Sequence, residues 1–433
     1  MRQNETLFWI WLAEALGAAN SDFRRLIEVY ETPYEMFEAD AEQLERLHLK
    51  EKTVASLSDK GLQRASEILD ACEQLGIGVM PYDSELYPRP LREIKNPPVV
   101  LYYVGTVPKF GESLCIGVVG TRRMSAYGME MAYKISYELA SGNAVTVSGL
   151  AAGIDGVCAA ATLRANGMTV AVLGCGLDRA YPANHGKLMN EIARKGLLLS
   201  EYPPGTRPLH YHFPTRNRII SGLSHAIVVI EAGLGSGSLI TAKDAVMQGK
   251  DVFAVPSNAV GKGTEGTNGL LRDGAYFAAC AEDIARKYEY LFPSVFHSDR
   301  VRAAEKHSQV DVSYLRSCGV LDQSTPQTAV REQEELTEVK PTAKKRSVRG
   351  SEPKRDAEST ESKKTKNQTS DAVLQSLTPI QLDVLRAIPD DQTVSADALV
   401  KLEHPYGEIL TALTMLEIMG LVEKLPGAVY RKA

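Results

Sequence analysis

One stretch, from Ala226 to Pro256, constrains the fold of this chain more than any other. It begins with five apolar, mostly β-branched residues, Ala226–Ile230, a pattern typical of a parallel strand buried on both faces. Glu231 and a glycine-rich turn follow, then an expected helix from about Leu239 to Gln248 and a second apolar strand, Val252–Val255. The turn offers free backbone N–H groups to an anion such as phosphate, although a tight crossover alone would also require its glycines.

The same alternation of apolar strands and helical segments runs from Cys115 to about Lys287 and predicts an α/β fold with a doubly wound parallel sheet. The other expected strands are Cys115–Val119, Ala144–Val147, Thr169–Leu173 and Leu197–Leu199, and the expected helices between them include Tyr127–Leu139, Ala151–Arg164 and Lys187–Arg194. Ligands of such sheets bind beyond the carboxyl ends of the strands. The candidate phosphate contacts at these ends and in the glycine-rich turn are Gly120, Arg122, Ser125, Ser148, Gly149, Gly153, Ser236, Gly237 and Ser238.

The segment from His210 to Ser221 adds aromatic and cationic side chains to this edge. Arginines beside aromatic rings are typical of single-strand nucleic-acid binding, because guanidinium groups hold the backbone while bases stack on the rings. The candidates are His210, Phe213, Arg216, Asn217 and Arg218. Alternatively, the arginines form internal ion pairs with Glu201 or Glu231. His210 and His212 could also be metal ligands, but no cysteine or further histidine stands at a useful spacing, and no metal is expected.

The composition excludes several classes of protein. A chain of 433 residues with 44% hydrophobic and 24% charged residues is typical of a soluble protein with two to four domains. The net charge of -5 excludes a globally basic nucleic-acid coat, so a polyanion must bind a local patch. Six cysteines without CxxC spacing argue against a zinc site or a disulfide framework. The first residues mix acidic with apolar side chains, so we expect neither a signal peptide nor a membrane span, and a cytoplasmic location.

The pattern divides the chain into four parts. Residues 1–72 are expected to form a small helical domain, whose turn at Leu47-His48-Leu49 lacks the glycine of a DNA-gripping hairpin and favours a packing role. Residues 73–293 form the sheet domain, entered through a proline-rich arm and a strand at Val99–Val104. Residues 294–375 are predicted to be a disordered, charged linker, and residues 376–433 a winged helix.

The charges of the C-terminal parts differ. Between Lys340 and Lys366, ten Lys or Arg face four Asp or Glu, so the linker could hold DNA weakly or act only as a solvated spacer. From Ser376 onward, five Lys or Arg face eight Asp or Glu, and the expected third helix, Tyr406–Met419, has no basic residue. A helix that reads a duplex groove should be basic, so we expect this module to contact protein.

Five motifs, taken in order, resemble the DNA-processing protein A (DprA/Smf) family. They are Gly120-Thr-Arg122, Ser148 to Asp155, Gly174 to Asp178 with Tyr181-Pro182, Phe213-Pro-Thr-Arg-Asn-Arg218, and Ser236 to Ala242. The resemblance covers about Pro81 to Tyr276 and implies an extended Rossmann-like domain without a cofactor. It further implies a homodimer that binds single-stranded DNA without base specificity and helps to load the RecA recombinase in natural transformation and recombination.

The resemblance also implies roles for the matching residues. Arg122 would be the main phosphate-binding arginine and Phe213 a base-contacting ring. Ser148, Gly149 and Gly153 would offer donors, whereas Arg216, Asn217 and Arg218 would shape the pocket, with Asp155, Glu231 and Asn268 as structural residues. The chain departs from the family at His210, where some relatives have lysine, and at Pro256-Ser257, where proline-glycine is usual.

Catalysis is not expected, because no pattern pairs a nucleophile with an oriented base. The alternative is a nucleotide-processing Rossmann hydrolase, similar to a phosphoribohydrolase, in which Glu231 acts as acid or base beside a phosphate loop. This alternative predicts turnover of a mononucleotide. The binding hypothesis predicts instead a salt-sensitive affinity for single strands and no product.

Overall fold

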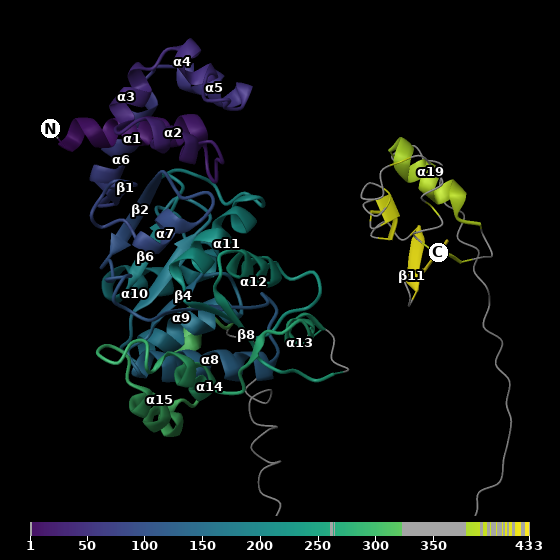
Figure 1. Ribbon diagram of the computed structural model, residues 1–433. Coiled ribbons are helices and arrows are strands. Elements are labelled where there is room, and N and C mark those ends of the chain that lie inside the picture. The colour runs from purple at the N-terminus through teal and green to yellow at the C-terminus, as the bar shows by residue number, and fades with distance from the viewer. Residues whose placement is uncertain are drawn as a thin grey trace, which may run out of the picture. The chain divides into compact units, whose positions relative to one another are not determined.

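The computed structural model describes residues 2–259, 263 and 265–322 and, in the C-terminal part, 378–389, 393–395, 399, 404, 409, 412–413, 415–417, 421–425 and 429–432. The chain divides into two compact units, Met1–Pro341 and Thr342–Ala433. Figure 1 shows that the first unit contains a central sheet with helices on both faces and a group of helices from the N-terminus at one end.

The sheet of the first unit contains nine strands among the described residues, in the order β1-β2-β6-β5-β4-β3-β7-β8-β9. They are β1 (Gly78–Pro81), β2 (Val100–Gly105), β3 (Cys115–Val119), β4 (Val145–Ser148), β5 (Thr169–Leu173), β6 (Leu197–Ser200), β7 (Ala226–Val229), β8 (Asp251–Ala254) and β9 (Tyr276–Phe277). Seven neighbouring strands, β6, β5, β4, β3, β7, β8 and β9, are parallel to one another. Strands β1 and β2 extend this sheet in antiparallel pairing. The predicted doubly wound sheet is confirmed, and its strand order reverses at β3, between β4 and β7.

Helices cover both faces because the central strands are apolar on both. One face packs against α8 (Ala126–Ser141), α9 (Ile154–Arg164) and α10 (Gly186–Lys195). The other packs against α7 (Arg89–Glu93), α11 (His212–Leu223) and α12 (Gly237–Met247). The expected helices lie within three residues of α8, α9, α10 and α12, but α11 was not expected as a helix.

Six short helices precede the sheet: α1 (Arg2–Leu16), α2 (Phe23–Val29), α3 (Pro33–Glu38), α4 (Ala41–Glu45), α5 (Glu51–Ser58) and α6 (Gln63–Leu75). Helix α6 continues past the expected boundary at residue 72 and leads directly into β1. His48, in the turn between α4 and α5, adopts a left-handed conformation with φ of 52°. Its carbonyl accepts a hydrogen bond from Arg25 at 2.8 Å, so an internal contact occupies the turn.

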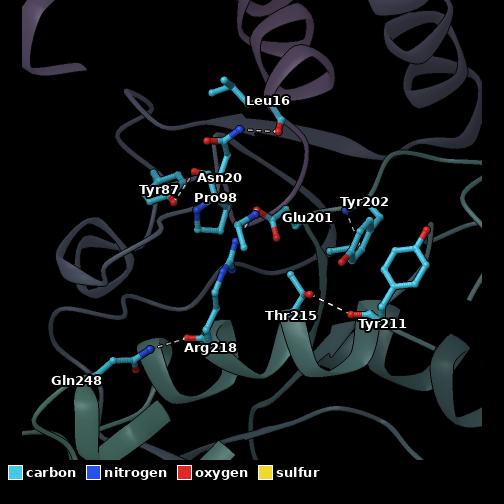
Figure 2. A network of polar contacts seen from close by, with 12 residues as sticks. Leu16, Asn20, Tyr87, Pro98, Glu201, Tyr202, Tyr211, Thr215, Arg218 and Gln248 are labelled. Atoms are coloured by element: carbon cyan, nitrogen blue, oxygen red, sulfur yellow. Dashed lines mark hydrogen bonds and ion pairs between the residues drawn. The ribbon is translucent and has the colours of Figure 1, made fainter. Parts of the chain in front are cut away.

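A buried ion pair connects the helical region to the sheet. The Arg218 guanidinium on α11 lies 2.6 Å from the Glu201 carboxylate, with side chains only 11% and 7% exposed. Glu201 also accepts a hydrogen bond from the Ala19 backbone N–H at 3.3 Å. Figure 2 shows Gln248, which donates to the Arg218 carbonyl at 3.1 Å. The N-terminal helical region and α11 therefore meet at one carboxylate.

The chain beyond the sheet folds back onto it. Helices α14 (Ala281–Tyr288), α15 (Ser298–Ala304) and α16 (Val312–Ser317) bury Val301 and Leu315. Ser308 donates a hydrogen bond to the buried Glu138 carboxylate of α8 at 2.8 Å. The prediction of a disordered linker from residue 294 is therefore wrong for residues 298–321, because a few spaced apolar residues suffice to dock this segment. The rest of the predicted linker, 323–375, lies outside the described residues.

The second unit contains α19 (Pro379–Ala387) and a three-stranded antiparallel sheet of β10 (Val394–Ser395), β11 (Val422–Leu425) and β12 (Val429–Lys432). Thr378 caps α19 through a reciprocal contact with Gln381. The expected third helix falls mostly on residues outside the described ranges, as does the turn at Pro426-Gly427. Within the described ranges, no helix has the length and apolar character needed to span a membrane.

We expect Leu315→Ala to lower the free energy of unfolding by about 2–5 kcal/mol, because a fully buried leucine leaves a cavity. Urea denaturation measures the change. The matched control is Leu291→Ala, whose side chain is 67% exposed and whose loss should cost below about 0.5 kcal/mol. Equal effects of the two substitutions would show that residues 298–321 do not dock in solution.

We expect Arg218→Ala to cost about 3–5 kcal/mol of stability, because it leaves the Glu201 carboxylate buried without its cation. Arg286→Ala, which removes a more exposed pair with Glu282 at 3.2 Å, should cost below about 1 kcal/mol. The double substitution Arg218→Met with Glu201→Leu should recover most of the loss. Thermal or urea unfolding of the four proteins tests this, and a double variant as unstable as Arg218→Ala would contradict it.

Candidate nucleic-acid interface

A cavity of about 390 Å³ opens at the carboxyl ends of β3 and β7, where the strand order reverses. Its lining residues come from the loops after the strands, from α11 and from the start of α12. They are Val119, Gly120, Arg122, Ala151, Asp155, His210, Phe213, Pro214, Arg216, Asn217, Ile220, Gly235, Ser236, Gly237, Ser238 and Thr241. Ten of the expected contact or pocket residues are therefore brought together in one pocket, at the place where such sheets bind ligands.

Arg122 and the Phe213 ring form the rim of the cavity, and a second ring lies beside them. The Arg122 side chain is exposed, and its guanidinium carbon lies 5.2 Å from the centroid of the Phe213 ring. The Tyr181 ring lies 5.0 Å from Phe213 with a tilt of 31° between the ring planes. A Cβ on Gly174 would lie 3.1 Å from the Phe213 ring, so this glycine makes room for it. The rim thus presents a cation and an aromatic surface side by side.

The inner wall carries a second, buried cation. Arg216 is only 4% exposed, and its Nη1 donates to the Val172 carbonyl. Burial lowers the pKa of Arg216 to about 10, while the nearby Asp155 carboxylate raises it. The guanidinium therefore stays charged at neutral pH. A Cβ on Gly149 would lie 2.3 Å from Arg216 Nη1, so only glycine fits between this strand end and the guanidinium.

Asp155 fixes the turn after β4. Its carboxylate accepts a hydrogen bond from the Gly149 backbone N–H at 2.9 Å. Burial raises the pKa of Asp155, whereas Arg216 and the backbone donors lower it. Asp155 is therefore an internal partner of the pocket wall.

The start of α12 supplies backbone donors. Ser236 caps this eleven-residue helix by accepting from the Ser238 N–H at 3.4 Å, and the two hydroxyl oxygens lie 2.7 Å apart. Asn217 donates to the Gly237 carbonyl at 3.2 Å and so joins α11 to this helix start. A helix N-terminus carries partial positive charge, which favours an anion in the pocket.

Other expected residues lie outside the cavity lining. The Glu231 carboxylate accepts hydrogen bonds from the backbone and the hydroxyl of Ser125, both at 3.0 Å. Ser148 is buried and donates a hydrogen bond to the Asp155 carbonyl at 3.4 Å. Gly153 has φ of 82° and lies under the loop that carries Arg122, while Asn268 exchanges two hydrogen bonds with Ser257. Arg218 pairs with Glu201, as the alternative interpretation of this arginine proposed.

The two histidines of the segment point to different surroundings. His210 is exposed at the pocket, whereas His212 is buried, stacks on Tyr202 at 4.0 Å and lies 3.1 Å from the Gly174 carbonyl through Nδ1. Burial lowers the pKa of His212. In the part of the chain that the structure describes, no three His, Cys, Asp or Glu side chains gather as metal ligands.

Two residues were not expected from the sequence: Thr241, which lines the cavity, and Tyr181, whose ring lies beside Phe213. Phe213, Asn217 and Ile220 are four and then three positions apart, which is the spacing of one helix face, and all three line the pocket. That spacing would have revealed α11. Tyr181 could have been found only from its place after the strand β5.

Comparison with known proteins places these features in a family. The model of DNA recombination-mediator protein A matches residues 78–289, and the model of the DprA winged helix domain matches residues 368–428. The latter bears out the winged helix expected at the C-terminus.

Individual relatives agree with this assignment. Protein Smf of Synechocystis sp. is 30% identical over the full length of both chains. DNA processing protein DprA of Bacillus subtilis is 42% identical over 217 residues, which cover 50% of this chain and 73% of the relative. The X-ray structure of DNA processing protein A from Streptococcus pneumoniae superposes with a TM-score of 0.58 at 31% identity and covers 65% of this chain and 98% of that one. The chain therefore belongs to the DNA recombination-mediator protein A (DprA/Smf) family.

Proposed function

We propose that this protein binds single-stranded DNA without base specificity in the pocket at the strand reversal. The observation that carries the proposal is Arg122 held at 5.2 Å over the Phe213 ring, at the mouth of a cavity that also contains the start of α12. A cation beside an aromatic ring matches the alternating phosphates and bases of a single strand.

Different residues of the pocket wall are suited to the phosphates and to the bases of a single strand. Arg122 and the Gly237 backbone N–H are suited to phosphate, with the charge of Arg216 behind them. The hydroxyls of Ser236 and Ser238 lie beside them, whereas the N–H groups of these two serines already donate within the turn. Phe213 offers a stacking surface that accepts every base, because each base has an aromatic face. Phosphate contacts carry no sequence information, so this arrangement supports binding without base specificity.

We further propose that the protein protects the bound strand and helps to load the RecA recombinase, as a cytoplasmic homodimer acting in transformation and recombination. The description of the family as recombination mediators supports this role. The short edge strand β9 exposes Tyr276 and Phe277, at 48% and 56%, and supports association of two copies. The acidic composition of the C-terminal module supports contact with protein through that module.

The proposed role is one of binding without catalysis. The nucleotide hydrolase alternative requires Glu231 to face the ligand as acid or base. In the structure, Glu231 is 5% exposed, accepts two hydrogen bonds from Ser125 and lies beside the start of α8. These contacts support a structural role for this carboxylate.

We expect Arg122→Ala to weaken binding of labelled oligothymidine at least tenfold and to reduce the slope of log affinity against log salt by about 0.7, the value for one lost phosphate contact on a single strand. The matched control is Arg123→Ala, the next residue, which is exposed but does not line the pocket. Fluorescence anisotropy across a salt series measures both effects. Equal losses of affinity for the two variants would mean that the overall positive charge of this loop, and not Arg122 itself, binds the strand. Failure of the wild type to bind single strands would refute the proposal.

We expect wild type and Glu231→Gln to leave nucleoside monophosphates intact, because Glu231 is bonded to Ser125 instead of facing a ligand. Chromatography of nucleotides incubated with each protein detects a released base or sugar phosphate. Glu231→Gln should retain oligothymidine binding, since the amide oxygen can still accept from Ser125. Turnover by the wild type that disappears in Glu231→Gln would establish the hydrolase instead.

A further inference from the structure

The aromatic surface of the pocket extends beyond Phe213 to Tyr181. The two rings lie 5.0 Å apart, and Tyr181 is half-buried, just outside the residues that line the cavity. Arg179, two positions earlier on the same loop, exposes 47% of its side chain and lies 3.5 Å from the Asp178 carboxylate. A strand that passes from Arg122 over Phe213 would therefore next meet another ring and another cation.

The loop that carries Tyr181 is anchored from outside the pocket. Directly after Tyr181-Pro182 comes a 3-10 turn, Ala183–His185, which leads into α10. His185 is buried and lies 3.2 Å from the Leu150 carbonyl through Nδ1, in the turn after β4. This contact fixes the inner side of the loop.

The outer side of the loop is held by the segment that folds back after the sheet domain, residues 311–321, which we call the α16 segment. The Asn184 side chain donates to the Gly319 carbonyl at 2.8 Å. Gly319 has φ of 79°, and a Cβ there would lie 2.0 Å from the Asn184 carbonyl oxygen, so the contact requires glycine. Tyr314 also donates to Glu191 of α10 at 2.6 Å. The α16 segment therefore bonds both to the turn after Tyr181 and to the helix that follows it.

We propose that Tyr181 is a second base-stacking residue of the single-strand site and that the α16 segment, through Asn184 and Gly319, is the positioning element that holds it beside Phe213. The inference rests on the proposed function. It assigns to residues beyond the matched sheet-domain model, 78–289, a role in forming the site. Asn184 and Gly319 touch neither pocket nor ligand and act only through Tyr181.

The test uses the full chain and oligothymidine with one 2-aminopurine base, whose fluorescence falls when it stacks on a ring. Tyr181→Ala should weaken binding roughly fivefold to 150-fold, which corresponds to the loss of one stacked base, and reduce the quenching. Tyr181→Phe should retain both, because the hydroxyl is not needed for stacking. Asn184→Ala should weaken binding severalfold in the wild type and have no further effect in Tyr181→Ala, because it acts through that ring.

The control is Asn190→Ala, an exposed asparagine on α10 that should change neither readout. Arg122→Ala, measured in parallel, separates this inference from the proposed function. If Arg122→Ala loses binding while Tyr181→Ala and Asn184→Ala match the wild type, the Tyr181 proposal is overturned and the pocket remains. If the wild type does not bind single strands, both fail. Additive losses for Asn184→Ala and Tyr181→Ala would overturn the positioning role alone.

Discussion

The buried guanidinium of Arg216 is the interaction on which the ligand edge of the sheet depends. A charge that is 4% exposed must be compensated by the protein, and here the Val172 carbonyl and the Asp155 carboxylate provide the compensation. Asp155 in turn holds the Gly149 backbone at 2.9 Å. The ends of β4 and β5 and the helices α9 and α11 are thereby fixed around one cation, which supplies positive potential to the cavity without any movement of the side chain.

The carboxylates at this edge are each engaged by the protein. Asp155 accepts from Gly149, Glu201 pairs with Arg218, and Glu231 accepts from Ser125. Because these contacts orient the negative charges toward internal donors, they oppose a bound phosphate less than free carboxylates would. The same contacts connect α8, α11 and the N-terminal helices to the sheet, so the electrostatics of the site and the assembly of the domain use the same groups.

Much of the fold could be predicted from the sequence, because apolar runs such as Cys115–Val119 and Thr169–Leu173 have no stable place except a buried parallel sheet. The loops after these strands identified most of the pocket for the same reason. The partner of each arginine could not be predicted from the sequence. Arg216 and Arg218 are two positions apart, yet Arg216 lines the cavity and Arg218 pairs with Glu201. Residues 298–321 were misjudged because docking there depends on the surface of α8 and α9, which local composition does not describe.

The close packing of Gly149 against Arg216 limits which substitutions this chain can tolerate. An added methyl group at Gly149 would meet the guanidinium at 2.3 Å, and one at Gly153 would meet the Thr121 carbonyl at 2.4 Å, under the loop that carries Arg122. In a saturation mutagenesis survey, these two positions should therefore tolerate as few replacements as the arginines themselves. Substitutions at glycines that do not line the cavity would then be tolerated as poorly as substitutions in its lining, and a map of intolerant positions would include the backbone beneath the pocket.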